Sequence, residues 1–150
     1  MSLLNDIRNA RKNNTTYRVG LLQTKAYRKL KQRTNDTLKP YKISSIEWAY
    51  LGMLHEYKDG IRPNDIADII GVEAPFITSL SSRFEKEGTL KHIKDTTDGR
   101  AKKILLTQRG HALVIEIEAL LRTESKKWLK GVSAREIITF LKVLAVLSKD

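Results

Sequence analysis

The stretch of sequence that decides the fold is "PNDIADIIGVEAPFITSLSSRFEKEG", residues 63–88. It contains two short amphipathic segments on either side of "GVE", residues 71–73. Pro63 suits the first turn of a helix, and Gly71 can end it. A three-residue turn that begins with glycine sets two helices at a steep angle, as in a helix-turn-helix. The sequence therefore predicts this motif, although the same geometry also occurs as ordinary packing in helical domains.

The second helix of the motif, about residues 74–87, is predicted to turn Ile77, Leu80 and Phe84 inward and to expose a polar face. A helix in this position can enter the major groove of DNA with its N-terminal residues foremost. Ser and Thr hydroxyls can bind bases or phosphates, and Phe76 can contact a thymine methyl. Arg83, two turns along, suits a phosphate better than a base. The candidate DNA-binding residues here, which could also be only a solvated face, are Pro75, Phe76, Thr78, Ser79, Ser82 and Arg83.

A basic ribbon is predicted to follow the motif. The segments "TLKHIKD" (89–95) and "AKKILLT" (101–107) are typical of two short strands joined by a turn. A ribbon beside a major-groove helix reaches the neighbouring minor groove, which attracts arginine where A/T pairs make it narrow. Arg100 is the candidate, with Asp98 able to hold its guanidinium group; the alternative is an ordinary solvated turn residue. Phosphate contacts are predicted for Lys94, Lys102 and Lys103.

Helical patterns flank this region on both sides. A short helix is expected over residues 2–12, a second after the capping residues 13–16 and up to about Leu38, before Pro40, and another after Ser44 or Ser45. Thr107 can cap a long helix, and Ser133 with Glu136 forms a capping box for the last one. Further inward-facing positions are predicted at Ile46, Ala49, Tyr50, Met53, Leu54, Tyr57, Ile66, Ala67, Ile69, Ile70, Leu113, Ile117, Leu120, Leu121, Trp128, Ile137, Phe140, Leu141, Leu144 and Leu147. The fold class is mainly α with a small β-ribbon, a winged helix-turn-helix.

Charge and composition narrow the function. The 150 residues fit one domain, 1–150, and carry a formal net charge of +11, which favours nucleic acid as a partner. Residues 1–42 hold 11 Lys and Arg against 2 Asp and Glu, and residues 90–110 hold 6 against 2. There is no cysteine, so thiol redox chemistry and thiolate metal sites are excluded. No signal peptide or membrane span is evident, so we expect a cytoplasmic protein without a membrane partner.

The chain resembles the MarR/SlyA family of transcriptional regulators over essentially its whole length. The similarity is most specific in "DTTDGRAKKILLTQRG" (95–110), with Asp95, Asp98, Arg100, Leu106, Thr107 and Gly110 on the pattern of the family's wing. The segments "ADIIGVEAPFITSLSSRFEKEG" (67–88) and "ISSIEWAYLGML" (43–54) are similar to its recognition segment and second helix. The resemblance implies a homodimer that binds a pseudo-palindromic operator, with a winged lobe at about 44–110 and dimerisation helices at about 5–38 and 112–147.

The resemblance also implies a small aromatic or phenolic effector, bound in a cleft between the dimerisation helices and the winged lobe. Candidate residues for lining this cleft are Tyr17, Tyr27, Trp48, Tyr50 and His55, although each also fits ordinary packing. We expect no cofactor and no metal, because His55, His92 and His111 are spread along the chain. Two departures from the family pattern are Arg62, where a capping Thr is usual, and Glu73, where Ser, Asp or Asn usually caps the recognition helix.

Two other kinds of function compete with a DNA-binding regulator. A winged helix can serve as a protein–protein interaction module without binding DNA, although the basic ribbon argues against this alternative. An enzyme is disfavoured, because the sequence has no nucleophile–base pair, phosphate-binding loop or metal-ligand spacing. The sequence therefore predicts a ligand-responsive repressor that acts as a homodimer on double-stranded DNA.

Overall fold

The computed structural model describes residues 5, 8, 16–99 and 101–149. From residue 16 on, the elements follow the order that the sequence predicts, whereas the short helix expected at 2–12 lies almost entirely outside the described residues. They are α2 (Thr16–Leu38), a 3₁₀ turn η1 (Lys39–Tyr41), α3 (Ser45–Glu56), α4 (Pro63–Ile70), α5 (Ala74–Lys86), β1 (Leu90–Lys94), β2 (Lys102–Leu106), α6 (Gln108–Trp128) and α7 (Ala134–Leu147). None of the helices in these ranges combines the length and hydrophobicity that crossing a bilayer requires.

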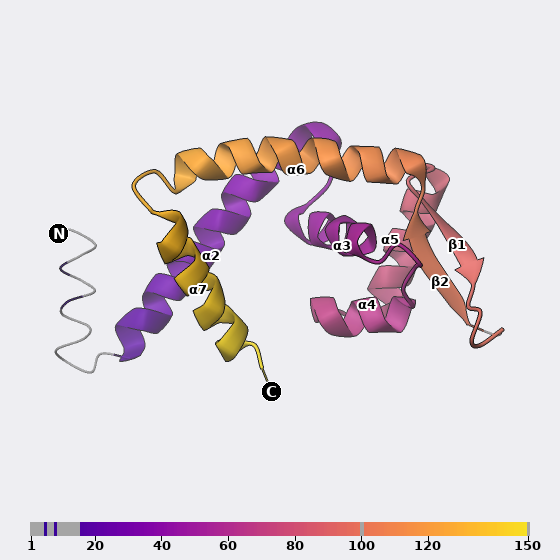
Figure 1. The fold of residues 1–150 in the computed structure, drawn as a ribbon, viewed down its shortest axis with the longest axis horizontal. Coiled ribbons are helices and arrows are strands. Elements are labelled where there is room, and N and C mark those ends of the chain that lie inside the picture. The colour runs from indigo at the N-terminus through magenta and orange to yellow at the C-terminus, as the bar shows by residue number, and fades with distance from the viewer. Residues whose placement is uncertain (1–4, 6–7, 9–15, 100, 150) are drawn as a thin grey trace.

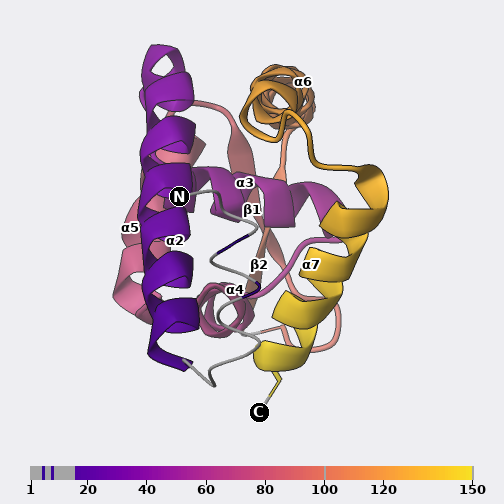
Figure 2. The same cartoon turned by 90° about the vertical axis from the view of Figure 1, so that its left-hand side faces the viewer.

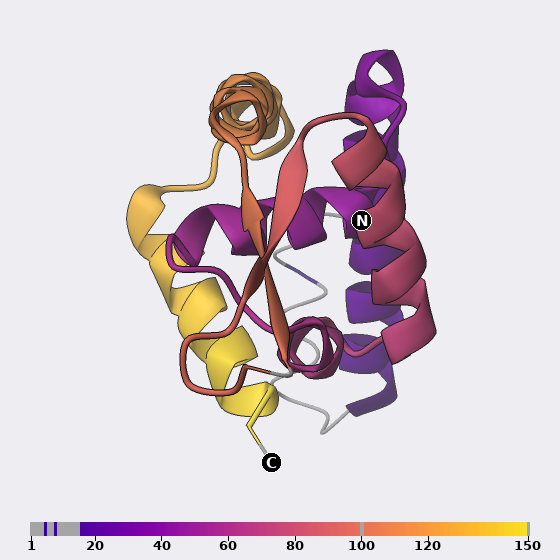
Figure 3. The same cartoon turned by 90° about the vertical axis from the view of Figure 1, so that its right-hand side faces the viewer.

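Helix α6 runs along the top of the molecule and joins its two ends (Figure 1). At one end α2 and α7 descend as two separate columns, which Figure 2 shows from that side. At the other end lie α3, α4, α5 and the antiparallel ribbon β1–β2, with α5 beside the ribbon (Figure 3). Ile61 extends the ribbon by pairing with Ile104, a contact that the alternation pattern did not reveal.

Local signals set the ends of these helices. Ser44 caps α3 in a capping box with Glu47, as the sequence predicts, and Ser133 caps α7 in the same way. The hydroxyl of Thr107 accepts a hydrogen bond from the amide of Gly110 at the start of α6. A cap of this kind contributes about 1 kcal/mol to helix stability. By contrast, α5 begins without a side-chain cap, because Glu73 makes no such bond.

Gly110 sets the junction between α6 and the ribbon. A Cβ atom placed on Gly110 would lie 2.1 Å from the carbonyl oxygen of Thr89. The amide of Thr107 also donates to that carbonyl, at 3.0 Å. Only glycine therefore lets α6 begin this close to β1, which accounts for the glycine at this point of the sequence pattern.

The buried apolar residues form two connected clusters. The larger one lies among α3, α4, α5, the ribbon and the start of α6, and it includes Tyr50, Phe84 and Ile104. The smaller one joins the end of α2 to α6 through Leu38, Ile117 and Leu121. The residues that pack against both clusters, and so connect them, are Ile43, Trp48 and Leu113.

Several positions predicted to face inward are exposed. Ile69 of α4 is 58% exposed, Tyr57 is 43% exposed and Ala49 is exposed as well, because all three lie beside a cleft rather than in the core. The apolar stripe of α7 is also open to solvent within one chain, as are many apolar side chains of α2. The exposed apolar residues of these two helices are Tyr17, Val19, Leu21, Leu22, Tyr27, Leu30, Ile138, Phe140, Leu141, Val143, Leu144, Val146 and Leu147.

Candidate nucleic-acid interface and effector cleft

Helix α5 presents the face that the sequence predicts for DNA contact. Ile77, Leu80 and Phe84 are buried, which fixes the rotation of the helix about its axis. The opposite side exposes a compact set of small, polar and aromatic groups, namely Pro75, Phe76, Thr78, Ser79 and Ser82. The hydroxyl of Thr78 donates to the carbonyl of Ala74, and the hydroxyl of Ser82 donates to the carbonyl of Thr78. Both hydroxyl oxygens can therefore still accept a hydrogen bond from a partner.

The ribbon carries two exposed lysines opposite each other. Lys94 and Lys102 are direct cross-strand partners at the end of the ribbon next to its turn. Like charges in such a pair destabilise a sheet, so this arrangement favours an anionic partner. Lys103 lies on the other face, where its Nζ is 3.9 Å from Oδ1 of Asp95. Of the three predicted phosphate contacts, Lys94 and Lys102 therefore lie at the surface, whereas Lys103 lies within ion-pair distance of Asp95.

Arg100 lies outside the described residues, so its predicted contact with Asp98 stays a prediction. Asp98 itself lies in the turn, where its carbonyl accepts from the amide of Ala101 at 2.9 Å. The geometry around Asp95, at the start of the turn, is well defined. Its carboxylate is 2% exposed and accepts hydrogen bonds from both the amide and the hydroxyl of Thr97.

Arg62 completes the site of Asp95 from a distant part of the chain. Its Nε donates to Oδ2 of Asp95 at 2.7 Å, and Thr97 lies within 3.5 Å of its Nη2. The hydrogen bonds from Thr97, together with the Arg62 charge, hold the pKa of Asp95 well below its usual range. Sequence reasoning treated Arg62 only as a missing cap. No local signal could have paired it with Asp95, because 33 residues separate them.

A second polar contact fixes the ribbon to the recognition helix. Nδ1 of His92 on β1 lies 2.9 Å from Oε1 of Glu85 on α5. The contact with His92 lowers the pKa of Glu85, so the carboxylate stays charged at neutral pH. The ribbon and the exposed face of α5 are therefore held as one unit.

Arg83 is engaged within the protein. Its Nη1 lies 2.8 Å from Oε1 of Glu47 on α3, and its guanidinium group lies over the ring of Phe84 at 4.5 Å. Its Nε is 3.7 Å from Glu87, too far for a hydrogen bond. The predicted role of Arg83 as a phosphate contact therefore competes with a structural contact to Glu47.

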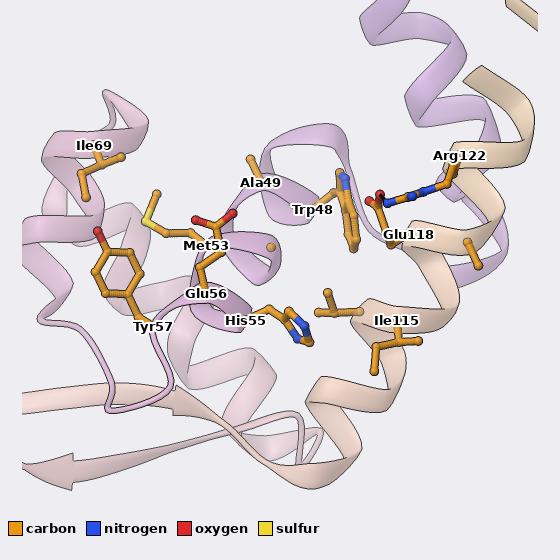
Figure 4. A pocket seen from close by; sticks show the side chains of 13 residues that line it. Trp48, Ala49, Met53, His55, Glu56, Tyr57, Ile69, Ile115, Glu118 and Arg122 are labelled. Carbon is orange, nitrogen blue, oxygen red and sulfur yellow. Dashed lines mark hydrogen bonds and ion pairs between the residues drawn. The ribbon is translucent and has the colours of Figure 1, made fainter. Parts of the chain in front are cut away.

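A cleft of about 780 Å³ opens between α3, α4 and α6 (Figure 4). This volume lies within the range of small-molecule sites. Its walls are mostly apolar, with Trp48, Met53 and Ile115 among them, and its polar groups include His55 and an ion pair. The ion pair joins Nη2 of Arg122 to Oε1 of Glu118 at 3.0 Å.

The cleft brings together only part of the predicted effector set. Trp48 and His55 line it, whereas Tyr50 does not, because its side chain is fully buried in the core. The hydroxyl of Tyr50 bonds that of Ser81 at 2.8 Å, and burial raises the pKa of Tyr50 to about 12. Tyr17 and Tyr27 lie exposed on α2, away from this cleft within one chain. Sequence periodicity missed the opposite wall on α6, including Arg122.

Two histidines that are distant in sequence meet at the edge of the cleft. Nδ1 of His55 and Nδ1 of His111 are 3.0 Å apart, so one ring donates its proton to the other. Burial is the main cause that lowers the pKa of His111, and the nearby His55 and Lys58 lower it further. The part of the chain that the structure describes contains no group of three metal-ligating side chains.

Solved structures with the same arrangement support a specific fold. A MarR-family transcriptional regulator from Rhodococcus sp. RHA1 superposes with a TM-score of 0.80 at 18% identity, over 89% of this chain and 95% of that one. The chain has the winged-helix fold of the MarR family. CouR from Rhodococcus jostii RHA1, bound to p-coumaroyl-CoA, gives 0.78 at 19% identity over 86% and 90% of the two chains. No protein-family model matches the sequence.

The MarR fold also occurs in complexes with DNA. A mutant MarR from E. coli complexed with operator DNA matches with a TM-score of 0.74 at 19% identity. The match covers 99% of this chain and all of that one, at 100%. The solved structures with this fold thus include one bound to operator DNA and one bound to an aromatic CoA ester.

Proposed function

We propose that the protein is a ligand-responsive repressor that binds double-stranded operator DNA as a homodimer. The observation that carries this proposal is the joint surface of α5 and the ribbon. It combines an exposed hydroxyl-rich helix face with the opposed pair Lys94 and Lys102, in a chain of net charge +11. Hydroxyls and the ring of Phe76 would read bases, and the lysines would bind phosphates. Arg100 would enter the adjacent minor groove.

The dimer would form through the two dimerisation segments, about 5–38 and 112–147, leaving about 44–110 as the winged lobe. The exposed apolar side chains of α2 and α7 support this division. Apolar surfaces of this extent usually mark a site of contact with another protein, and in the dimer they would be shielded from water. A two-fold axis would present two copies of α5 about 34 Å apart, one turn of DNA. The operator would then be pseudo-palindromic.

The effector would bind in the cleft lined by Trp48, His55 and the apolar wall of α6. An aromatic or phenolic compound fits the mixture of a large indole ring, aliphatic side chains and a few polar groups. The CoA ester bound by CouR supports an aromatic acid derivative as the first compound to test. Binding there would change the position of the winged lobe relative to α6 and so lower the affinity for DNA.

Selection of bound sequences from random duplex DNA tests the proposal. The recovered sequences should contain an inverted repeat with half-sites about one helical turn apart. Affinity for this duplex should fall steeply with salt, and each lost phosphate contact should reduce the slope by about 0.9. Arg100→Ala should weaken binding to A/T-rich flanks, with Lys149→Ala as a control for loss of a positive charge far from the ribbon. A protein that binds no duplex at low ionic strength, while a protein partner co-purifies with it, would instead be an interaction module.

A further inference from the structure

Helix α3 lies between a proposed dimerisation helix and the recognition helix, and polar contacts join it to both. On one side, the side-chain oxygen of Asn35 on α2 accepts a hydrogen bond from the amide of Ser45 at 2.7 Å. On the other side, Glu47 contacts Arg83 on α5 at 2.8 Å. Ser45 and Glu47 belong to the same first turn of α3. One turn of helix therefore connects α2 to α5.

The carboxylate of Glu47 performs two tasks within this turn. Its Oε2 accepts from the amide of Ser44 at 2.6 Å, which closes the capping box, and its Oε1 contacts Arg83. The side chain of Glu47 is 14% exposed and that of Arg83 is 42% exposed, so water is largely excluded from the carboxylate but only partly from the arginine. A partly enclosed contact between charged groups is screened less by salt than one at the open surface.

Arg83 is held from several sides, which limits its use elsewhere. Its Nε and Nη2 are buried without a hydrogen-bond partner among the described residues. The ring of Phe84 lies beneath the guanidinium group, and Phe84 is itself in the core. Reaching a phosphate would require Arg83 to leave Glu47, and the mostly buried carboxylate of Glu47 would then lack its positive partner.

A second polar contact joins α3 to α5 beside the first one. Tyr50, one turn after Glu47, bonds Ser81 at 2.8 Å. The hydroxyl of Ser81 donates to the carbonyl of Ile77, so the proton in this bond comes from Tyr50. Two contacts one turn apart fix both the position and the rotation of α5 on α3.

We propose that Glu47 is a positioning residue, which acts through Arg83 to hold the recognition helix in register with α2. This inference rests on the proposed function and assigns Arg83 to the scaffold rather than to a phosphate. The expected effect on DNA affinity is opposite to the one that net charge alone would predict. Removing the negative charge of Glu47 should weaken DNA binding, although the change makes the protein more positive and releases Arg83 toward the DNA.

Glu47→Gln is the decisive variant, because glutamine can still complete a capping box. Operator affinity should fall about tenfold, the loss typical of one hydrogen-bonded charge pair. The slope of log affinity against log salt should not change, since no phosphate contact is lost. Arg83→Met should cause a similar loss with the same slope, and the double variant should be no worse than either single one. Glu87→Gln, an equal change of charge at the exposed neighbour of Arg83, should match the wild type.

Three results would overturn the inference. They are unchanged or tighter operator binding by Glu47→Gln, additive losses in the double variant, or a slope for Arg83→Met that is smaller by about 0.9 per half-site. The last would make Arg83 a phosphate contact. Hydrogen exchange of α5 gives a readout without DNA: it should be faster in Glu47→Gln and unchanged in Glu87→Gln. If the wild type binds no duplex at all, the proposed function fails on its own, and equal α5 exchange in the two variants would also reject the positioning role.

Discussion

Arg62 and Asp95 connect the start of α4 to the turn of the ribbon, with Nε of Arg62 donating to Oδ2 of Asp95 at 2.7 Å. The aspartate is almost fully buried, whereas the arginine side chain is 41% exposed. The contact therefore holds the ribbon against the helix-turn-helix from its inner side. It also places an arginine, at the position before Pro63, where a capping residue would otherwise stand.

Asp95→Asn should lower the melting temperature by several degrees. The substitution keeps the shape of the side chain but leaves Arg62 and Thr97 without the negative charge that their donors face. Thermal unfolding followed by circular dichroism measures this loss. Asp68→Asn, an equal change at an exposed position of α4, should leave the melting temperature close to that of the wild type. An Asp95→Asn protein as stable as the wild type would contradict this account.

Asp95 should also make stability sensitive to acid. Its pKa is lowered in the folded protein, so its contribution is complete above the unfolded value of about 3.9 and is lost as pH falls through the folded pKa. Between pH 5 and 2 the wild type should therefore lose more stability than Asp95→Asn. Melting curves across this range test the prediction, and parallel losses in the two proteins would refute it.

The histidine pair should destabilise the fold in mildly acidic solution. The pKa of His111 is lowered, so the unfolded chain takes up a proton more readily than the folded one. Stability should be complete above about pH 6.5 and should decline as pH falls toward the folded pKa. His111→Gln should reduce this decline in urea titrations at pH 8 and pH 5.5. His92→Gln, outside the pair, should retain it.

Filling the cleft should abolish the effector response without abolishing DNA binding. Ala119 lines the cleft on α6 and lies outside the proposed DNA surface. Ala119→Trp should raise the concentration of p-coumaroyl-CoA or 4-hydroxybenzoate that halves operator binding by at least about tenfold. In the protein that keeps Ala119, Trp48 fluorescence in a Trp128→Phe background reports binding directly, because the chain has 2 tryptophans. Effector-dependent release that survives in Ala119→Trp would place the effector elsewhere.

The apolar face of α7 should be required for assembly. Phe140 is 60% exposed within one chain, and a charge there would be buried in the proposed dimer. Phe140→Glu should sediment as a monomer at micromolar concentration and lose operator binding, while its helical circular dichroism persists. Lys142→Glu, at an exposed charged position two residues after Phe140, should remain a dimer. A wild-type protein that sediments as a monomer would reject the dimer model.

Sequence patterns predicted the elements of this fold because their signals are local. Ser44, Thr107 and Ser133 act within one turn of the helices that they cap, and the charge of the ribbon lies within a few residues. The contacts that organise the site are not local. Those of Arg62 with Asp95 and His55 with His111 join residues 33 and 56 positions apart, and neither follows from periodicity.

Periodicity also misjudged positions whose surroundings come from distant segments. Tyr57 and Ile69 were predicted to lie in the core, but they face the cleft, because the wall opposite them belongs to α6. The stripe of α7 is apolar as predicted and yet exposed, since none of the other described elements covers it. A helical pattern shows which side of a helix is apolar, but it does not show which segment packs against that side.

If the exposed apolar stripes on α2 and α7 are shielded in the proposed homodimer, the stability of the protein should depend on its concentration. In a homodimer these stripes would be shielded only while two copies are associated, so dilution would favour dissociation and unfolding together. The apparent melting temperature should then rise with protein concentration. In a cell, a fall in the number of copies would weaken both the persistence of the folded chain and its occupancy of DNA.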